Sequence, residues 1–347
     1  MKMIQLAGDL QIAPISIGCW SFGGGAYWGE QSQSDVDAVV GGALEAGVNL
    51  FDTAEGYNGG DSEISLGRAL KGRRQKAVIM TKVPPEFAHL PDLARHCDES
   101  LRRLDTDYID IYALHWPLNK RAIQPGTQDP YLLEYHADAA EAFDGLQRLQ
   151  KAGKIRHIAV SNFGVVQLTE VVEQTGVRPV LNEILYNLIS RGIEEEVLPC
   201  CVKNDVGILA YMPFHQALLT GKYDSVDEMP ANQMRTRHFH AKRGGRHGGE
   251  GFEEDTFQTV AAINALAGEL GIPMSQLALS WVVQQGGVAS ALVGCRNTKQ
   301  LQQNLAAARE PLAQTVMDRL DAITTPLLYK LGHHPDYYES TATSRIY

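Results

Sequence analysis

Three apolar runs in the sequence are each followed by ionisable side chains. The stretch FDTAEGY brings Asp52 and, five residues later, Tyr57, while MTKV contains Lys82 and ALHWP contains His115. Each residue alone has an ordinary structural explanation, because aspartates cap loops, lysines are usually solvated and tyrosines in glycine-rich turns often only pack. The four residue types together, however, can donate and accept a proton.

The chemistry of such a set follows from how its members change one another. A phenol with a pKa of about 10 is a poor acid at neutral pH, and a neighbouring Lys82 ammonium would lower the pKa of Tyr57. Asp52 would keep a partly buried lysine charged, and a neutral His115 imidazole would orient a carbonyl oxygen. This set suits protonation of an oxygen as hydride reaches its carbon. A strand-end lysine can also form a Schiff base, so a lyase or aldolase acting through Lys82 is an alternative.

The elements that must position these residues follow an alternating pattern. Short runs rich in β-branched residues alternate with longer amphipathic segments, as in βα units. The expected strands are 15–20, 48–53, 77–83, 109–115, 155–162, 180–187, 206–214 and 288–294, and the expected helices are 34–46, 62–70, 92–104, 136–152, 165–174, 194–203, 273–285 and 298–308. Eight such units predict an α/β fold with one (β/α)8 barrel domain over residues 1–347, rather than an open doubly wound sheet.

Four segments fall outside the eight units. We expect an N-terminal strand or hairpin as a cap, an inserted helix near 255–270, a large mobile loop at about 222–254 and a C-terminal extension at about 311–347. The stretch 229–249 carries five basic residues and no acidic one. It is interpreted either as a flap over an anionic ligand or as a solvated loop.

Composition narrows the classes of function. The chain has 347 residues, 44% of them hydrophobic, which is enough for a sizeable core. Its net charge of −10 disfavours nucleic acid and anionic membrane surfaces as partners. No apolar run approaches the roughly 20 residues of a membrane span, so a soluble cytoplasmic protein is expected. Five cysteines without a CxxC pair indicate reduced thiols, and His238, His240 and His247 lack nearby carboxylates, so no metal site is expected.

Longer motifs connect the four ionisable residues to a known family. The sequence resembles the aldo-keto reductase family over essentially its whole length, in FDTAEGYNGGDSEISLGRAL, VIMTKV, SLRRLDTDYIDIYALHWP, IRHIAVSNF and GILAYMPFHQALLTGKY. The resemblance implies a barrel reductase whose catalytic tetrad matches Asp52, Tyr57, Lys82 and His115, with Tyr57 as proton donor. It also implies a nicotinamide cofactor, although no GxGxxG motif follows the first strand.

The same resemblance implies where the cofactor binds. Ser161 and Asn162 would hydrogen-bond the nicotinamide carboxamide, and Tyr211 would stack on its ring. The segment after Tyr211 would line the pyrophosphate, and the last strand would lead to the adenosine end. The residues expected in these two stretches are Pro213, Leu218, Gly221 and Lys222, then Gly294, Arg296, Gln300 and Asn304.

Two positions bear on the choice and the redox state of the cofactor. Arg296 suits a 2′-phosphate and favours NADP(H) over NAD(H), whereas Gly294 and Cys295, where some family members carry a Lys-Ser pair, keep NAD(H) open. Glu183 stands where the family usually has a glutamine that contacts the carboxamide. We hypothesise that Glu183 shifts relative affinity toward the oxidised cofactor, with a loop-solvated glutamate paired to a nearby base as the alternative.

The expected substrate is a small carbonyl compound. Aromatic residues that would border it are Trp20, Phe22, Tyr27, Trp28 and Trp116. The sequence predicts an NADP(H)-dependent oxidoreductase that transfers hydride between nicotinamide and an aldehyde, ketone or sugar and the corresponding alcohol. The alternatives are an NAD-preferring sugar or polyol dehydrogenase, the Schiff-base enzyme, and a cofactor-sensing regulatory subunit with little turnover; a homo-oligomer is possible in each case.

Overall fold

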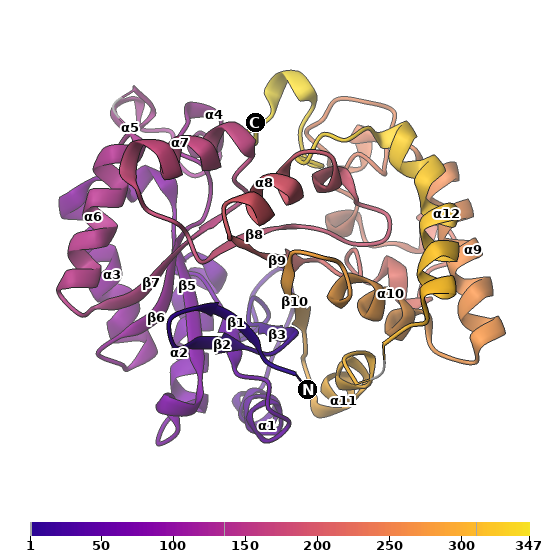
Figure 1. The fold of residues 1–347 in the computed structure, drawn as a ribbon, viewed down its shortest axis with the longest axis horizontal. Helices are drawn as coiled ribbons and strands as arrows, with labels where there is room; N and C mark the ends of the chain where they lie inside the picture. The colour runs from indigo at the N-terminus through magenta and orange to yellow at the C-terminus, as the bar shows by residue number, and fades with distance from the viewer. Residues whose placement is uncertain (1, 135, 310) are drawn as a thin grey trace.

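A closed barrel of eight parallel strands forms the centre of the molecule (Figure 1). The computed structural model describes residues 2–134, 136–309 and 311–347. The strands are β3 (Ile15–Gly18), β4 (Leu50–Asp52), β5 (Val78–Val83), β6 (Ile109–Leu114), β7 (Ile155–Ser161), β8 (Leu181–Leu185), β9 (Gly207–Tyr211) and β10 (Val288–Gly294), and β10 pairs with β3 to close the ring. The predicted α/β barrel is confirmed. Most predicted strands were too long, because their outer residues already belong to rim loops.

Helices surround the strands (Figure 1). In α3 the residues Leu93, Cys97, Leu101 and Leu104 recur every three or four positions, and all are buried. The helices of the eight units are α1 (Gln33–Glu45), α2 (Asp61–Ala69), α3 (Leu90–Leu104), α6 (Ala139–Lys151), α7 (Val165–Thr175), α8 (Val197–Lys203), α10 (Met274–Val283) and α11 (Thr298–Ala307). Two short helices, α4 (Lys120–Ile123) and α5 (Pro130–Glu134), lie in the loop after β6.

An N-terminal hairpin caps the amino end of the barrel, as predicted. Strands β1 (Ile4–Ala7) and β2 (Leu10–Ile12) pair antiparallel. Leu10 and Ile12 belong to the same buried cluster as Leu50, Met80 and Ile111, which lie on barrel strands. The hairpin therefore covers the barrel interior at this end.

A polar cluster ties the amino ends of neighbouring strands together. Asp110 on β6 accepts hydrogen bonds from the Ile79 amide (2.9 Å), from Arg74 (2.5 Å) and from Arg156 (3.2 Å). Both guanidinium groups also lie over the ring of Tyr108, with their carbons 4.1 and 3.8 Å from its centre. We call these four residues, Arg74, Tyr108, Asp110 and Arg156, the amino-end cluster.

The inserted helix and the helix of the C-terminal extension lie together at one edge of the molecule (Figure 1). The inserted helix α9 (Glu253–Leu270) and the extension helix α12 (Gln314–Leu331) lie next to each other (Figure 1). Among the described residues no single helix is long and apolar enough to cross a membrane. Only α9 and α10 together reach the required length and composition, and they meet at a bend of 98°.

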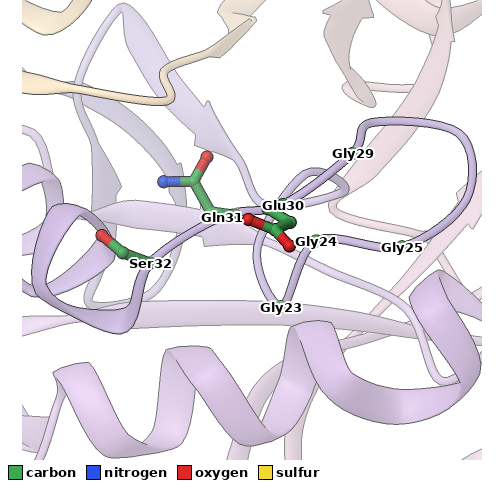
Figure 2. Close-up of a pocket in the computed structure, with 7 residues that line it drawn as sticks. All are labelled: Gly23, Gly24, Gly25, Gly29, Glu30, Gln31 and Ser32. Atoms are coloured by element: carbon green, nitrogen blue, oxygen red, sulfur yellow. The ribbon is translucent and has the colours of Figure 1, made fainter.

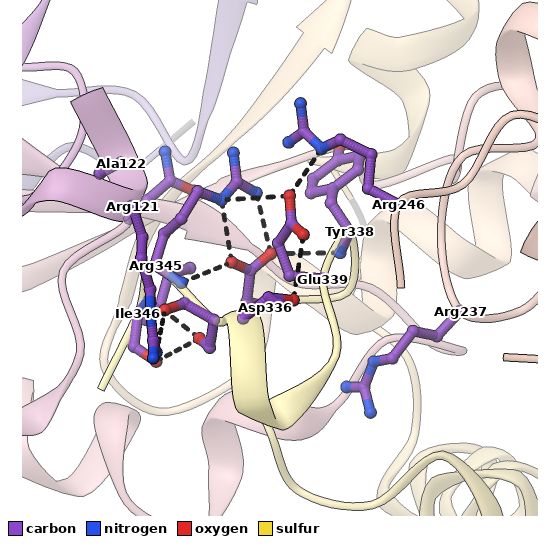
Figure 3. Close-up of polar contacts among 12 residues, drawn as sticks. Arg121, Ala122, Arg237, Arg246, Asp336, Tyr338, Glu339, Arg345 and Ile346 are labelled. Atoms are coloured by element: carbon purple, nitrogen blue, oxygen red, sulfur yellow. Dashed lines mark hydrogen bonds and ion pairs between the residues drawn. The ribbon is translucent and has the colours of Figure 1, made fainter. Parts of the chain in front are cut away.

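The loop before α9 is bonded to the C-terminal extension. Arg246 forms an ion pair with Glu339 at 2.6 Å, and Arg345 binds both carboxylate oxygens of Asp336, at 3.0 and 2.9 Å (Figure 3). Arg237 donates to the Leu331 carbonyl at 2.7 Å. Several basic side chains of 229–249 thus already have protein partners, and the mobility of this loop stays a prediction.

Candidate active site

Strand register brings the predicted catalytic residues to one rim. Asp52 is the last residue of β4 and pairs with Met80 of β5, while Lys82 of β5 pairs with Ala113 of β6, two residues before His115. All three therefore lie at the carboxyl ends of adjacent parallel strands, where barrel enzymes place their chemistry. Tyr57 follows β4 in the short helical turn η1 (Tyr57–Gly60).

Lys82 is the centre of the site. Its side chain is fully buried. Its ammonium donates to Asp52 Oδ1 at 2.5 Å, to the Thr53 carbonyl at 3.0 Å and to the Tyr57 hydroxyl at 3.3 Å. The Tyr57 ring lies edge-on to His115, with ring centres 5.7 Å apart. The structure thus assembles all four predicted residues.

Glu183 approaches the same ammonium from another strand. It lies in β8 and is 4% exposed, and its Oε2 lies 3.2 Å from Lys82 Nζ. The alternative of a loop-solvated glutamate is therefore wrong. Its second part, a nearby basic partner for Glu183, is correct, and that partner is Lys82. We call Asp52, Lys82 and Glu183 the carboxyl-end cluster.

Burial and charge set the protonation states of this site. Burial opposes the charge on Lys82, but Asp52 and Glu183 outweigh burial and raise the pKa of Lys82, so it is an ammonium. Burial, together with the charge of Glu183, raises the pKa of Asp52 well above its usual range. Burial, assisted by the Lys82 charge, lowers the pKa of His115 to about 3, so its imidazole is neutral.

The predicted effect of Lys82 on Tyr57 is only part of the balance. Burial raises the pKa of Tyr57, and this effect outweighs the opposing effect of the Lys82 charge. The predicted direction of the Lys82 effect is therefore confirmed, but burial, which the prediction left out, raises the pKa of Tyr57 above its usual value. Tyr57 is held as a neutral phenol, which is the form that can donate a proton.

An aromatic wall lies beside Tyr57. Trp20 stacks on Tyr57 with ring centres 5.7 Å apart, and it also contacts Tyr27 at 4.8 Å and Trp28 at 5.3 Å. Phe22 does not join the wall. Its side chain is 0% exposed within the main hydrophobic core, so the assignment of Phe22 to a substrate pocket is wrong.

Trp116 lies beneath the C-terminal extension. The guanidinium carbon of Arg345 is 3.7 Å from the centre of its ring, a cation–π contact. The same Arg345 is bound by Asp336 (Figure 3). The extension therefore borders the predicted substrate side of the rim.

The residues expected at the carboxamide are connected by hydrogen bonds. Asn162 donates through Nδ2 to Ser161 Oγ (3.0 Å) and accepts from the Tyr211 hydroxyl (2.9 Å), and Ser161 donates to the Glu183 carbonyl (3.1 Å). Asn162 has a φ of 63°, an uncommon conformation for a residue with a side chain. Such conformations gather at functional sites.

The segment expected at the pyrophosphate also contains residues with positive φ. After β9, His215, Gln216 and Ala217 have consecutive positive φ values of 43°, 54° and 75°. Lys222 and Gly221 are exposed, whereas Pro213 and Leu218 are buried. Leu218 is 0% exposed within the core, so only its backbone could face a ligand.

Arg296, expected at the adenosine end, is held by the loop after β3. Gln31 accepts from Arg296 Nε (2.9 Å) and donates to the Arg296 carbonyl (3.0 Å), and the guanidinium also donates to the Glu30 carbonyl. A cavity of about 540 Å³ adjoins this contact (Figure 2). Its lining residues are Gly23, Gly24, Gly25, Gly29, Glu30, Gln31 and Ser32.

The other residues expected at this end differ in exposure. Gln300 accepts from the Arg296 amide at 2.8 Å, and Asn304 is buried and donates to the Cys295 sulfur at 3.2 Å. Gly294 is exposed at the end of β10. The residues expected at the two ends of the cofactor thus differ: a cavity adjoins the Arg296 guanidinium, and Glu183 has a buried oxygen without a hydrogen-bond donor.

Three features were missed from the sequence. Strand parity places Glu183 on the same face of β8 as Leu181 and Leu185, but it does not identify Lys82 of β5 as the partner. The extension contacts gave no such signal. The third feature is a buried pair of rings, His215 and His238, with centres 4.3 Å apart.

The structure offers no evident metal centre within residues 2–134, 136–309 and 311–347. No group of three or more histidine, cysteine or acidic side chains there could hold a metal ion. His238 instead contacts the Ile189 carbonyl at 2.7 Å.

Comparisons with known proteins point to one family. The model of the aldo/keto reductase family matches residues 14–325. Methylglyoxal reductase YeaE of Escherichia coli is 30% identical over 92% of this chain and 94% of its own. The NADH-specific methylglyoxal reductase of Escherichia coli is 29% identical over 88% and 93%. A Klebsiella pneumoniae aldo/keto reductase solved with NADP and acetate has a TM-score of 0.71 and 26% identity, over 98% of this chain and 99% of the other.

Proposed function

Because the chain belongs to the aldo/keto reductase family and is an NAD(P)-dependent oxidoreductase acting on carbonyl groups, we propose that Tyr57 is its general acid and base. The observation that carries this proposal is the contact of one buried ammonium, Lys82, with both Asp52 and the Tyr57 hydroxyl. The substrate that we propose is a small aldehyde, ketone or sugar, or the corresponding alcohol.

In the reducing direction Tyr57 donates its proton to the carbonyl oxygen. The phenolate that remains lies beside the Lys82 ammonium, whose attraction offsets the cost of forming a buried anion. Asp52 keeps Lys82 in place and charged. His115, neutral because it is buried, can donate a hydrogen bond to the same carbonyl oxygen and orient it.

The cofactor supplies or accepts the hydride when it is bound. The chain's own residues would hold it: Ser161, Asn162 and Glu183 would contact the carboxamide, Tyr211 would pack on the ring, and Arg296 would bind the adenosine end. We propose NADP(H) as the preferred cofactor, because a guanidinium binds a phosphate through paired donors. A matched pair of Kd measurements tests this: Arg296→Leu should weaken NADPH binding by about tenfold and leave NADH binding unchanged.

One observation keeps the NAD-preferring sugar or polyol dehydrogenase as a second candidate. Gln31 and Glu30 already hold the Arg296 guanidinium, so a 2′-phosphate would have to share or replace these contacts. One relative named above is described as NADH-specific. If NADH binds more tightly than NADPH to the unaltered protein, this candidate replaces the first.

The remaining alternatives are less well supported by the contacts of Lys82. A Schiff base requires a neutral amine, and two buried carboxylates favour the charged ammonium of Lys82. A cofactor-sensing subunit with little turnover has no need of an ordered proton donor, yet the Tyr57 hydroxyl is within reach of Lys82.

The first experiment combines cofactor binding with turnover. NADPH and NADH would be titrated by fluorescence, and turnover followed at 340 nm with a panel of aldehydes, ketoses and aldoses. Tyr57→Phe should bind cofactor normally and lose at least about a thousandfold in kcat. Full activity of Tyr57→Phe would reject Tyr57 as the acid, and absence of nicotinamide binding would reject the proposed function as a whole.

A further inference from the structure

The carboxyl-end cluster holds more hydrogen-bond acceptors than its one cation can satisfy. An ammonium has three N–H donors. Four oxygens lie within 3.3 Å of Lys82 Nζ, from Asp52, Thr53, Tyr57 and Glu183. The first three accept hydrogen bonds, and Glu183 Oε2 is buried without a hydrogen-bond donor.

The same cluster is unbalanced in charge. With both carboxylates ionised, two negative charges face one positive charge. Asp52 is 1% exposed and Glu183 is 4% exposed, so water screens this excess poorly. A buried surplus charge is costly unless a proton or a cationic group compensates it.

No cationic side chain other than Lys82 is paired with the two carboxylates within the described part of the chain. The titratable groups facing the cluster come from four neighbouring segments and from the cluster itself, and each either is neutral or adds negative charge when it ionises. They are Cys19 after β3, Tyr57 in η1, His115 after β6, Tyr211 on β9, and Asp52 with Glu183 themselves. Compensation must therefore come from a proton or from a ligand.

The nicotinamide ring is the group whose charge changes in the reaction. It is neutral when reduced and carries one positive charge when oxidised. Hydride transfer requires this ring to contact the carbon whose oxygen meets Tyr57. Tyr57 and Glu183 both contact Lys82, so a reacting ring lies close to the surplus carboxylate.

We propose that Glu183 makes the protein bind oxidised nicotinamide cofactor more tightly, relative to reduced cofactor, than a neutral residue at this position would. Glu183 acts as a positioning and charge-setting residue, because its oxygen accepts from the carboxamide NH2 while its charge attracts the oxidised ring. This inference rests on the proposed function. Because hydride transfer to the carbonyl leaves the oxidised ring behind, this preference makes the bound reduced cofactor a stronger hydride donor, while the overall equilibrium of the reaction is unchanged.

The test compares dissociation constants rather than turnover. The ratio of the Kd for NADPH to the Kd for NADP+ would be measured by fluorescence and calorimetric titration at several values between about pH 6 and 9. In Glu183→Gln, which preserves size, this ratio should fall by at least about fivefold at one or more of these pH values. The pH series is needed because burial raises the pKa of Asp52 well above its usual range, so the charge of the cluster depends on pH.

A matched control distinguishes charge at the ring from loss of any buried glutamate. Glu63 on α2 is also fully buried, accepts from Thr81 Oγ1 (2.6 Å) and pairs with Arg103 outside the barrel. Glu63→Gln should therefore leave the ratio unchanged. Far-ultraviolet circular dichroism would confirm that both variants fold.

The outcomes separate the two proposals. If the unaltered protein binds both cofactor forms and Glu183→Gln keeps the ratio within twofold of it at every pH, the inference is wrong and the proposed function stands. An equal fall in Glu63→Gln also overturns the inference. If the unaltered protein binds neither form, the proposed function fails first and the inference fails with it.

Discussion

Each end of the barrel holds a cluster of three charged side chains, and the two clusters have opposite net charge when all three groups are ionised. The amino-end cluster places one carboxylate, Asp110, between two guanidinium groups, whereas the carboxyl-end cluster places one ammonium, Lys82, between two carboxylates. At the amino end the exposed fractions are 17% for Arg74 and 54% for Arg156, so the surplus positive charge reaches water.

This difference shows how similar residues serve stability at one end and reactivity at the other. Asp110 has all its donors in the protein, including the Ile79 amide, and binds no further group. The carboxyl-end cluster is closed from water and incompletely satisfied, and that combination leaves it dependent on a proton or a ligand. Barrel proteins generally divide their two faces in this way.

Removal of the carboxyl-end cation should have the largest effect. Lys82→Met leaves two unpaired buried carboxylates, so it should lower kcat by at least about a thousandfold and the free energy of unfolding by about 3–5 kcal/mol at neutral pH. Unpaired buried carboxyls have folded pKa values above their unfolded values, and their deficit shrinks as the pH falls toward about 4. Urea denaturation at pH 7 and 5 checks this; a deficit that does not change with pH would contradict it.

Acid should affect the two ends unequally. Burial lowers the pKa of His115 and of His238 to about 3 and that of His215 well below its usual value, and all three lie on the carboxyl side. Below about pH 6.5 these histidines become protonated in the unfolded chain but stay neutral in the folded protein. Each of these histidines then lowers the free energy of unfolding by up to about 1.4 kcal/mol for every pH unit. This loss continues until the pH reaches the pKa of the histidine in the folded protein.

Hydrogen exchange measures where this loss occurs. After correction for the intrinsic pH dependence of exchange, the loops after β9 and β6 should lose protection between pH 7 and 5 before the amino-end strands do. A uniform loss along the chain would argue against a difference between the ends.

The smallest effect is expected at the amino end. Asp110→Asn should lower the free energy of unfolding by about 1–3 kcal/mol, because the Ile79 amide and Arg74 lose a charged acceptor, with kcat/KM unchanged. Arg156→Ala serves as its control and should cost less than about 1 kcal/mol, since this guanidinium is half exposed. A drop in kcat/KM for Asp110→Asn would show that the two ends are coupled.

Features that depend on neighbouring residues could be predicted from the sequence, whereas contacts between distant strands could not. Strand and helix periodicity is local, so the barrel and the rim positions of Asp52, Lys82 and His115 could be predicted. The contact of Glu183 with Lys82 joins β8 to β5 across the barrel, and only the closed ring brings them together. The strand ends were misplaced because an apolar rim residue continues the strand pattern after the backbone ladder has ended.

Tyr57 and Phe22 show a second limit. Whether Lys82 or burial decides the pKa of Tyr57 depends on how completely the surrounding residues exclude water, and a sequence does not give that extent. Phe22 lies two residues from Trp20, which stacks on Tyr57, yet points into the core. Composition indicates an aromatic wall, but only the loop backbone decides which rings belong to it.

The C-terminal extension joins loops that come from different strands. Arg345 contacts Asp336, and Glu339 binds Arg246 in the loop before α9 (Figure 3). Arg345 also contacts the ring of Trp116, and its carbonyl accepts from Asn119 and Gln167. In a barrel whose loops are independent, one loop can be exchanged for another to change specificity. Here a loop graft would break bonds to its neighbours, so a new substrate range would require replacing the insertion, the loop after β6 and the extension as one unit.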